Sequence, residues 1–155
     1  MKMANSKAHL KRLRTLYYMA TPRQRFGIAK QRLDNPDSAP NNLIQAVSAT
    51  EGFARSGAIH ILATFKKSKL KWAYDQLEKK GPEFLIENCI CPYLKKSPEE
   101  LFGKKDWDNF QLAIQYRNLL IHEATFLNLA IARPFIKSTE TVFNKLGQTL
   151  GVASK

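Results

Sequence analysis

Apolar residues recur every three or four positions along most of the chain, while strand-like alternation is scarce. This is the period of amphipathic α-helices, and glycine and proline divide the pattern into segments. The two longest helices are predicted at residues 41–66 and 105–131, which favours an all-α fold, an antiparallel helical bundle with two long central helices. Shorter helices are predicted at residues 6–19, 22–33, 69–80, 83–91 and 134–150, with loops or stops at 35–40, Gly81-Pro82, Pro92 and Pro134.

Two short motifs mark where helices begin. Thr21 followed by Pro22 is typical of an N-cap with proline in the first helical position. The run Ser97-Pro98-Glu99-Glu100 resembles a capped helix start with acidic residues in its first turn. Both motifs support the predicted helical segments.

The charge of the chain is strongly positive and uneven. Its 155 residues include 25 lysines and arginines against 13 aspartates and glutamates, which gives a formal net charge of +12. Such a surface attracts polyanions, so nucleic acid is the first partner to consider, and a solubilising surface is the alternative. Asp34 is the first carboxylate, and the nine basic residues before it are Lys2, Lys7, Lys11, Arg12, Arg14, Arg23, Arg25, Lys30 and Arg32.

This charge pattern suggests how the chain is organised. We expect one compact domain, with a basic N-terminal helical segment at residues 1–34 followed by a helical bundle at residues 35–155. Nucleic-acid phosphates are expected to contact basic side chains in both parts, and a solvated face is the alternative. The candidates are Lys11, Arg12 and Arg14 in the segment and Lys66 and Lys67 in the bundle.

Several classes of protein are disfavoured by the sequence. No apolar run approaches the ~20 residues that span a bilayer, and the first residues lack the pattern of a secretory signal. Cys89 and Cys91 have no second cysteine or histidine cluster nearby in sequence, so reduced thiols explain them better than a zinc site. The carboxylates show no metal-ligand spacing. We therefore expect a cytoplasmic protein with no membrane partner, metal or cofactor.

A polar stripe runs along the second long predicted helix. At 100° per residue, one face of residues 111–127 is apolar and another is polar, with Arg117 at the edge of the polar face. Amides, a hydroxyl and an imidazole suit an interface or a site better than open solvent. The apolar face holds Leu112, Tyr116, Leu119, Leu120 and Leu127, and the polar face holds Gln111, Gln115, Asn118, His122 and Thr125.

Three of these side chains have the chemistry that RNA cleavage needs. The His122 imidazole can move protons near neutral pH, although a lone histidine on a helix is more often structural. Arg117 can hold a phosphate with a forked pair of hydrogen bonds and keeps its charge. Asn118 can donate to a phosphoryl oxygen or a ribose. Attack of a 2′-hydroxyl on phosphorus needs these roles: a proton carrier, a charge stabiliser and a positioning group.

The run Tyr116-Arg117-Asn118-Leu119-Leu120-Ile121-His122-Glu123 resembles the signature of the HEPN superfamily, in which arginine and a polar residue precede histidine after a short spacer. The resemblance covers roughly residues 41–150 and implies a HEPN-like bundle. It also implies a metal-independent ribonuclease in which Arg117, Asn118 and His122 carry the catalytic roles. HEPN proteins occur in toxin–antitoxin systems, anti-phage defence and RNA processing. The partners implied are therefore RNA, a second copy that completes the site across a homodimer, and a cognate antitoxin protein.

Three further residues are candidates for support of this site. Glu51 and Arg55, four residues apart, lie on the other long helix, where the family often keeps polar residues that face the motif. An ordinary helix-surface ion pair is the alternative. Glu123 falls near the apolar face, where it pairs with a buried cation or orients a neighbour. Base stacking is a further role to consider for three aromatic residues, although core packing is favoured: Trp72, Trp107 and Phe110.

Three functions remain open on the sequence. The first is an RNA-cleaving enzyme, and the second is a non-catalytic HEPN-like module that binds RNA, a nucleotide or a protein. The third is a helical interaction protein with no nucleic-acid role. Salt-dependent RNA binding separates the third from the others, because released counterions make such binding weaken with salt. Loss of cleavage in His122→Ala separates the first from the second.

Overall fold

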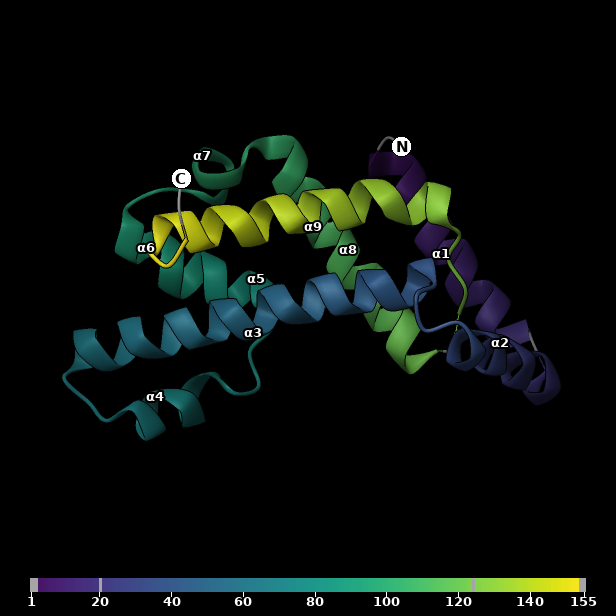
Figure 1. The fold of residues 1–155 in the computed structure, drawn as a ribbon, viewed down its shortest axis with the longest axis horizontal. Helices are drawn as coiled ribbons and strands as arrows, with labels where there is room; N and C mark the ends of the chain where they lie inside the picture. Colours follow the sequence, from purple (N-terminus) through teal and green to yellow (C-terminus); the bar gives the residue numbers. More distant parts are fainter. Residues whose placement is uncertain (1–2, 20, 124, 154–155) are drawn as a thin grey trace. The chain divides into compact units, whose positions relative to one another are not determined.

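The computed structural model describes residues 3–19, 21–123 and 125–153, and every regular element within these ranges is a helix (Figure 1). The absence of strands from this part of the chain confirms the predicted all-α class. In the same ranges, no helix has both the length and the apolar character needed to cross a membrane. In chain order the elements are α1 (Met3–Met19), α2 (Pro22–Asp34), α3 (Ala39–Lys66), α4 (Leu70–Leu77), α5 (Pro82–Leu85), the π-helix η1 (Ile86–Ile90), α6 (Cys91–Leu94), α7 (Pro98–Phe102), α8 (Lys104–His122) and α9 (Leu129–Thr149).

Both predicted helix starts are confirmed, and both are capping boxes. The Thr21 hydroxyl accepts a hydrogen bond from the Gln24 N–H at 3.3 Å, and the Gln24 side-chain oxygen accepts one from the Thr21 N–H at 2.8 Å. Ser97 and Glu100 exchange the same two bonds at 3.2 and 3.3 Å. These bonds satisfy N–H groups that the first turn of a helix leaves without intrahelical partners.

Helix α3 is the longest element, with 28 residues. It begins at Ala39, so the predicted loop at 35–40 is two residues too long. Proline is tolerated in the first turn of a helix, where its missing N–H has no intrahelical partner to lose, and Pro40 occupies that place. Gly57 permits a close approach further along the helix, because an added Cβ would lie 2.9 Å from the Leu150 side chain.

The prediction of a single helix over residues 105–131 is wrong. Helix α8 ends at His122, and α9 begins at Leu129, so the last helix is also longer than predicted. The Asn128 side-chain oxygen accepts a hydrogen bond from the Ile131 N–H at 3.0 Å, which caps the start of α9. Pro134 does not end a helix, since it lies within α9. Helical periodicity continues through residues 123–128, so the break comes from tertiary contacts that the pattern does not contain.

The prediction that Pro92 ends a helix over residues 83–91 is also wrong. Helices α5, η1 and α6 follow one another without a gap from Pro82 to Leu94. The Cys91 N–H donates to the Ile86 carbonyl five residues earlier, which is the hydrogen bond of a π-helix. A proline ring crowds the carbonyl four residues before it, and the wider π turn accommodates that crowding.

The chain forms two compact units. The first unit comprises Met1–Val47 and Asp108–Thr139, and the second comprises Ser48–Trp107 and Glu140–Lys155. The basic residues of the segment at 1–34 therefore belong to the same unit as the Arg117–His122 motif. Helices α3, α8 and α9 contribute residues to both units.

The core of the first unit centres on Tyr116, which is completely buried. Its ring centroid lies 5.0 Å from that of Phe135. Its hydroxyl forms a 2.9 Å hydrogen bond with His9 Nδ1 and donates to the Ser6 carbonyl at 3.4 Å. These contacts attach α1 to α8. Other buried apolar residues of this unit are Leu10, Leu43, Val47, Phe110, Leu119, Leu120 and Leu127.

The core of the second unit contains stacked aromatic rings. The Phe102 and Trp107 centroids lie 5.6 Å apart with 20° between the ring planes. Burial of Trp107 and Phe110 confirms that these two predicted stacking candidates are core residues, whereas Trp72 is 41% exposed. The other large buried side chains of this unit are Leu85, Ile86, Ile90 and Leu146.

Candidate active site at the end of helix α8

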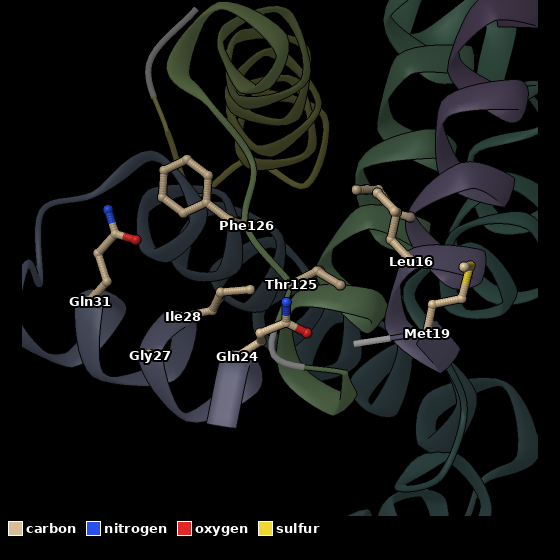
Figure 2. A pocket seen from close by; sticks show the side chains of 9 residues that line it. Leu16, Met19, Gln24, Gly27, Ile28, Gln31, Thr125 and Phe126 are labelled. Carbon is tan, nitrogen blue, oxygen red and sulfur yellow. The ribbon is translucent and has the colours of Figure 1, made fainter. Parts of the chain in front are cut away.

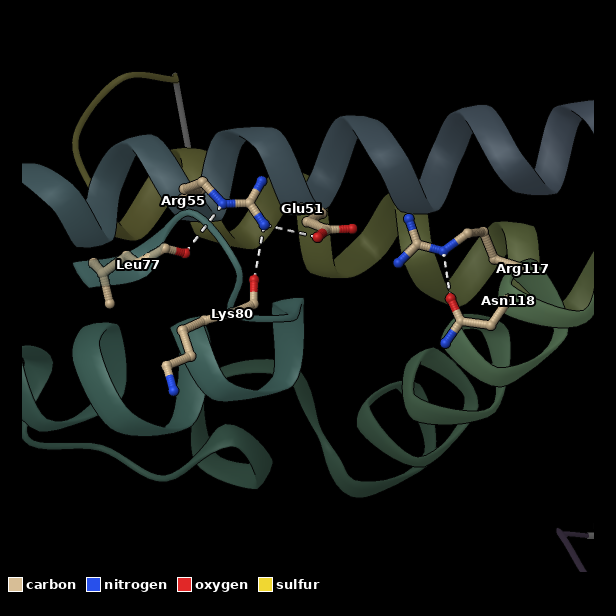
Figure 3. Close-up of polar contacts among 6 residues, drawn as sticks. All are labelled: Glu51, Arg55, Leu77, Lys80, Arg117 and Asn118. Carbon is tan, nitrogen blue, oxygen red and sulfur yellow. Dashed lines mark hydrogen bonds and ion pairs between the residues drawn. The ribbon is translucent and has the colours of Figure 1, made fainter. Parts of the chain in front are cut away.

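The three motif residues occupy the last two turns of α8. Arg117 is half-buried, and Asn118 and His122 are exposed. The Arg117 Nε donates a 3.0 Å hydrogen bond to the Asn118 Oδ1, which joins the guanidinium to the amide (Figure 3). Residues four apart lie on one face of a helix, so His122 follows Asn118 by one turn. The last two turns of α8 therefore carry a hydrogen-bonded guanidinium and amide, with an imidazole one turn beyond the amide.

Buried neighbours determine which way this end of α8 faces. Tyr116, Leu119 and Leu120 are buried, whereas Asn118 and His122 on the same two turns are exposed. Burial raises the pKa of Tyr116 to about 12, against the smaller opposing effect of its hydrogen bond to Ser6. The neutral phenol therefore keeps its bond to α1 at physiological pH.

A second arginine holds the carboxyl end of α8. The Arg32 Nη1 of α2 donates hydrogen bonds to the carbonyls of Leu120 and Thr125, the latter at 3.4 Å. The last carbonyls of a helix lack intrahelical partners and carry partial negative charge, so a guanidinium is a favourable partner. Burial lowers the pKa of Arg32 from its ordinary value. The Asn41 amide donates to the Arg32 carbonyl at 3.0 Å, which ties the start of α3 to α2.

Two polar side chains after the motif each have a buried oxygen without a hydrogen-bond partner among the described residues. They are Glu123, through its Oε2, and Thr125, through its hydroxyl. Thr125 was expected on the polar stripe of the long helix, and that placement is wrong because the residue lies beyond the end of α8 and is only 2% exposed. Leu127 likewise follows the helix rather than extending its apolar face. No ion pair of Glu123 with a buried cation is formed within the described ranges.

A largely apolar groove of about 640 Å³ adjoins this connecting segment (Figure 2). Its walls come from α1, α2 and residues Thr125 and Phe126. Leu16 and Met19 line the groove and are 51% and 77% exposed. Exposed apolar side chains gathered around a concave surface are typical of a binding surface.

The predicted RNA-contacting residues of α1 are in the first unit with the motif. Lys11, Arg12 and Arg14 are all exposed. Arg12 is close enough to His9 to add to the effect of burial, and together they lower the pKa of His9 from 6.5. Two other basic groups of this segment, Lys2 and the side chain of Arg25, lie outside the described part of the chain.

The remaining predicted residues lie in the second unit. Glu51 and Arg55 form an ion pair at 2.8 Å, and Arg55 also donates to the carbonyls of Leu77 at 3.5 Å and Lys80 at 2.8 Å (Figure 3). Arg55 thus joins α3 to the end of α4 and the turn after it. Lys66 and Lys67 are exposed at the carboxyl end of α3.

Two aromatic residues with chemistry suited to RNA were not singled out from the sequence. Phe65 and Tyr93 are 78% and 63% exposed and line one pocket of the second unit with Lys66. The available signal was local: each aromatic residue sits at a helix end and is followed by two lysines within three positions.

The described residues contain no group of three or more histidine, cysteine or carboxylate side chains arranged to hold a metal ion. Comparison of this chain with protein-family models, with curated proteins and with solved structures finds no match.

Proposed function

We propose that this chain is a metal-independent endoribonuclease of the HEPN kind and that its helices form a HEPN-like bundle. One observation carries the proposal: Arg117 is hydrogen-bonded to Asn118 one helical turn before the exposed His122. The bond holds a permanent positive charge beside an amide, and the exposed imidazole lies one turn beyond that amide. Arg117 and Asn118 can then bind the phosphate and the ribose, while His122 transfers the proton.

The proposed reaction is transfer of the RNA phosphate to its own ribose. His122 accepts the 2′-hydroxyl proton as the 2′-oxygen attacks phosphorus, and the bond from phosphorus to the 5′-oxygen breaks. The leaving 5′-oxygen takes a proton from a second imidazole. Arg117 stabilises the charge that develops on the phosphoryl oxygens, and Asn118 positions the ribose or phosphate. The products are a 2′,3′-cyclic phosphate and a 5′-hydroxyl.

A homodimer would supply that second imidazole. A two-fold axis beside the end of α8 would bring the His122 of each copy toward the other, so that one serves as base and the other as acid. The exposure of Asn118 and His122 is compatible with such an interface. Sedimentation velocity at tens of micromolar protein tests this part of the proposal, and a monomer there would contradict the shared site.

The decisive experiment is incubation of purified protein with end-labelled RNA in EDTA. We expect cleavage by the parent, products with cyclic phosphate ends, and a loss of roughly 100-fold or more in His122→Ala, which is what removal of a general acid–base group costs. His60→Ala is the matched control, because His60 is also an exposed histidine on a long helix but lies in the second unit. Cleavage that persists in His122→Ala, or that ceases in EDTA, contradicts the proposal.

A second candidate function is a non-catalytic module that binds a protein partner. The groove between α1 and α2 favours it, because exposed Leu16 and Met19 line the groove and Arg12 precedes Leu16 by one turn. An acidic polypeptide with apolar side chains fits this surface, and a cognate antitoxin encoded by an adjacent gene is the natural candidate. Intact RNA after incubation with the parent, combined with partner binding that Leu16→Ser weakens, would favour this function over the first.

A further inference from the structure

The second unit contains a pocket of about 320 Å³ between the end of α3 and the π-helical segment. Such a volume lies within the range of roughly 300–1,000 Å³ that is usual for sites of small ligands or of parts of larger ones. The residues that matter for its chemistry are Ile61, Phe65 and Lys66 from α3 and Asn88, Cys89 and Tyr93 from the opposite wall. All of them belong to the second unit, whereas the Arg117–Asn118–His122 motif belongs to the first.

Two aromatic side chains at this pocket remain largely exposed. Phe65 is 78% exposed and Tyr93 is 63% exposed, although both line a concave surface with apolar neighbours. Leaving a phenyl ring in water forgoes the free energy that its burial in a core would contribute. Flat rings that stay accessible at a pocket are well suited to stack on another flat ring, and every nucleobase presents one.

The two helices that carry these rings end in the same way. In α3 the Ser68 N–H donates to the Ala63 carbonyl at 2.9 Å and the Lys67 N–H donates to Thr64 at 3.2 Å. In α6 the corresponding bonds run from Lys96 to Cys91 at 3.2 Å and from Lys95 to Pro92 at 3.3 Å. Both are Schellman motifs, in which the residue after the helix takes a left-handed conformation and is usually glycine.

Lysine takes the place of glycine in both motifs. Lys67 has a φ of 49° and Lys95 a φ of 55°, and among the described residues no other non-glycine residue has a positive φ. A side chain in this region is strained relative to the right-handed conformation. The backbone is therefore strained at Lys67 and Lys95, which follow the pocket residues Phe65 and Tyr93 by two positions. Each strained position carries a positive charge that glycine would not supply.

Charge and hydrogen bonding around the rings match a nucleotide chain. Lys66, Lys67, Lys95 and Lys96 are all exposed and lie within three residues of the two aromatic side chains. Lys66 Nζ lies 5.6 Å from the centroid of the Phe65 ring. Asn88 adds an amide that can both donate to and accept from the edge of a base. Lysines that follow a phosphate backbone beside stacking aromatic residues are the usual means of binding single-stranded nucleic acid.

We propose that this pocket binds an unpaired nucleobase of single-stranded RNA, with Phe65 and Tyr93 as stacking surfaces and the four lysines on the adjacent phosphates. The inference rests on the proposed ribonuclease function, because it assigns the part of the protein that holds the substrate chain away from the scissile bond. It extends that function by naming the substrate class as RNA with unpaired bases.

The test separates binding from cleavage with a labelled single-stranded 2′-O-methyl oligonucleotide, which lacks the 2′-hydroxyl that cleavage needs. We expect Phe65→Ala and Tyr93→Ala each to weaken binding roughly 5- to 100-fold, as removal of one base-stacking ring does. Tyr93→Phe keeps the ring and should bind like the parent. Phe65→Leu keeps apolar volume without a π-face and should bind as weakly as Phe65→Ala. Thermal unfolding by circular dichroism shows that each variant is folded.

A chemical readout on the parent protein locates the bound strand. Cys89 lines the pocket, while Cys91 is buried and serves as the internal reference. The oligonucleotide should slow alkylation of Cys89, measured by mass spectrometry, and leave Cys91 unchanged. If the oligonucleotide also protects Cys89 in His122→Ala, the pocket binds RNA whether or not the chain cleaves it.

Three results would overturn the inference. Oligonucleotide binding by both alanine variants at the strength of the parent excludes the pocket from RNA binding. If Phe65→Leu binds the oligonucleotide as strongly as the parent, residue 65 makes a general apolar contact and does not stack on a base. A partner protein could make the same contact. Protection of Cys89 by adenosine monophosphate at the same concentration as by the oligonucleotide assigns the pocket to a free nucleotide instead of RNA.

Discussion

The guanidinium of Arg32 donates a hydrogen bond to the backbone carbonyl of Leu120, two residues before α8 ends. Residues 32 and 120 are far apart in the sequence, and their contact joins the basic N-terminal segment to the helix end that carries His122. The same Nη1 also reaches the carbonyl of Thr125, so one side chain spans the point where α8 stops. This relationship connects the stability of the first unit to the geometry of the candidate site.

Replacement of Arg32 by methionine should therefore destabilise the protein and loosen the end of α8. Two carbonyls would be left without their donor, and each such change costs about 1–3 kcal/mol when the group stays buried. The Arg32 Nε is itself buried without a hydrogen-bond partner, so removing this unsatisfied donor offsets part of the cost. We therefore expect a loss of stability near the lower end of that range. Urea unfolding measures the change, with Arg23→Met, an exposed arginine of the same helix, as control. Equal midpoints for the two variants would show that the Arg32 bonds do not hold the helix end.

Stability should fall as the pH drops below about 7, and His9 should account for part of the fall. Burial and, to a smaller extent, Arg12 lower the pKa of His9 from 6.5 in the folded protein. The unfolded chain therefore binds a proton at a higher pH than the folded chain. The His9 contribution to stability is complete above the unfolded pKa, and is lost progressively as the pH falls from there to the folded pKa. Urea midpoints between pH 8 and pH 5 measure this, and His9→Gln should flatten the profile.

Glycine at position 67 should make the protein more stable and a weaker RNA binder. Lys67 has a φ of 49°, so Lys67→Gly removes strain of about 1 kcal/mol, which corresponds to a rise in Tm of about 2–4 °C. It also removes a positive charge beside Phe65. Lys67→Ala is the matched control, because it removes the charge and keeps the Cβ. Both variants should bind the oligonucleotide more weakly, and only Lys67→Gly should gain stability. A Lys67→Gly variant that is more stable but binds RNA like the parent would show that the strained lysine does not contribute to RNA binding.

Neutralising Lys11, Arg12 and Arg14 together should weaken RNA binding more than it slows turnover. These exposed side chains of α1 are in the first unit, but the reacting groups are on α8. The dependence of log affinity on log salt should flatten by roughly 0.7 for each phosphate of a single strand that the variant no longer neutralises. The rate at saturating RNA should change little, because phosphate contacts that are equally strong in the ground state and the transition state contribute only uniform binding. Normal binding by the triple glutamine variant at low salt would assign α1 to packing or to a protein partner.

Much of the helical architecture is determined by the sequence alone. Apolar residues at helical spacing place α1, α2, α3 and α4 close to their observed bounds, because the same periodicity that marks a helix also marks the face that is buried. Local hydrogen bonds fix the two capping boxes at Thr21 and Ser97, and these depend only on residues three positions apart. The proximity of Arg117, Asn118 and His122 also follows from helical geometry, since all three are on one helix.

Tertiary structure decides where α8 ends. Residues 123–128 contain no proline or glycine and keep an apolar pattern, so local propensity continues the helix past His122. The structure instead ends it there, where Arg32 donates to the carbonyls of Leu120 and Thr125 and where Thr125 and Leu127 become buried. The Arg32 bonds come from a residue about ninety positions earlier in the chain, which no local pattern contains. As a result His122 lies at an open helix end rather than in the middle of a helix.

The pocket of the second unit also depends on tertiary structure. The Phe65 position fits the apolar face of α3, and Pro92 reads as a helix stop, so the sequence indicates a core residue and a chain break. The π-helix at Ile86–Ile90 carries the chain through Pro92 and places Asn88, Cys89 and Tyr93 opposite the end of α3. Folding leaves Phe65 78% exposed, because the apolar residues around it line an open pocket and do not cover the ring. Sequence periodicity reports which residues share a helix face, and only the packing of distant segments decides whether that face is covered.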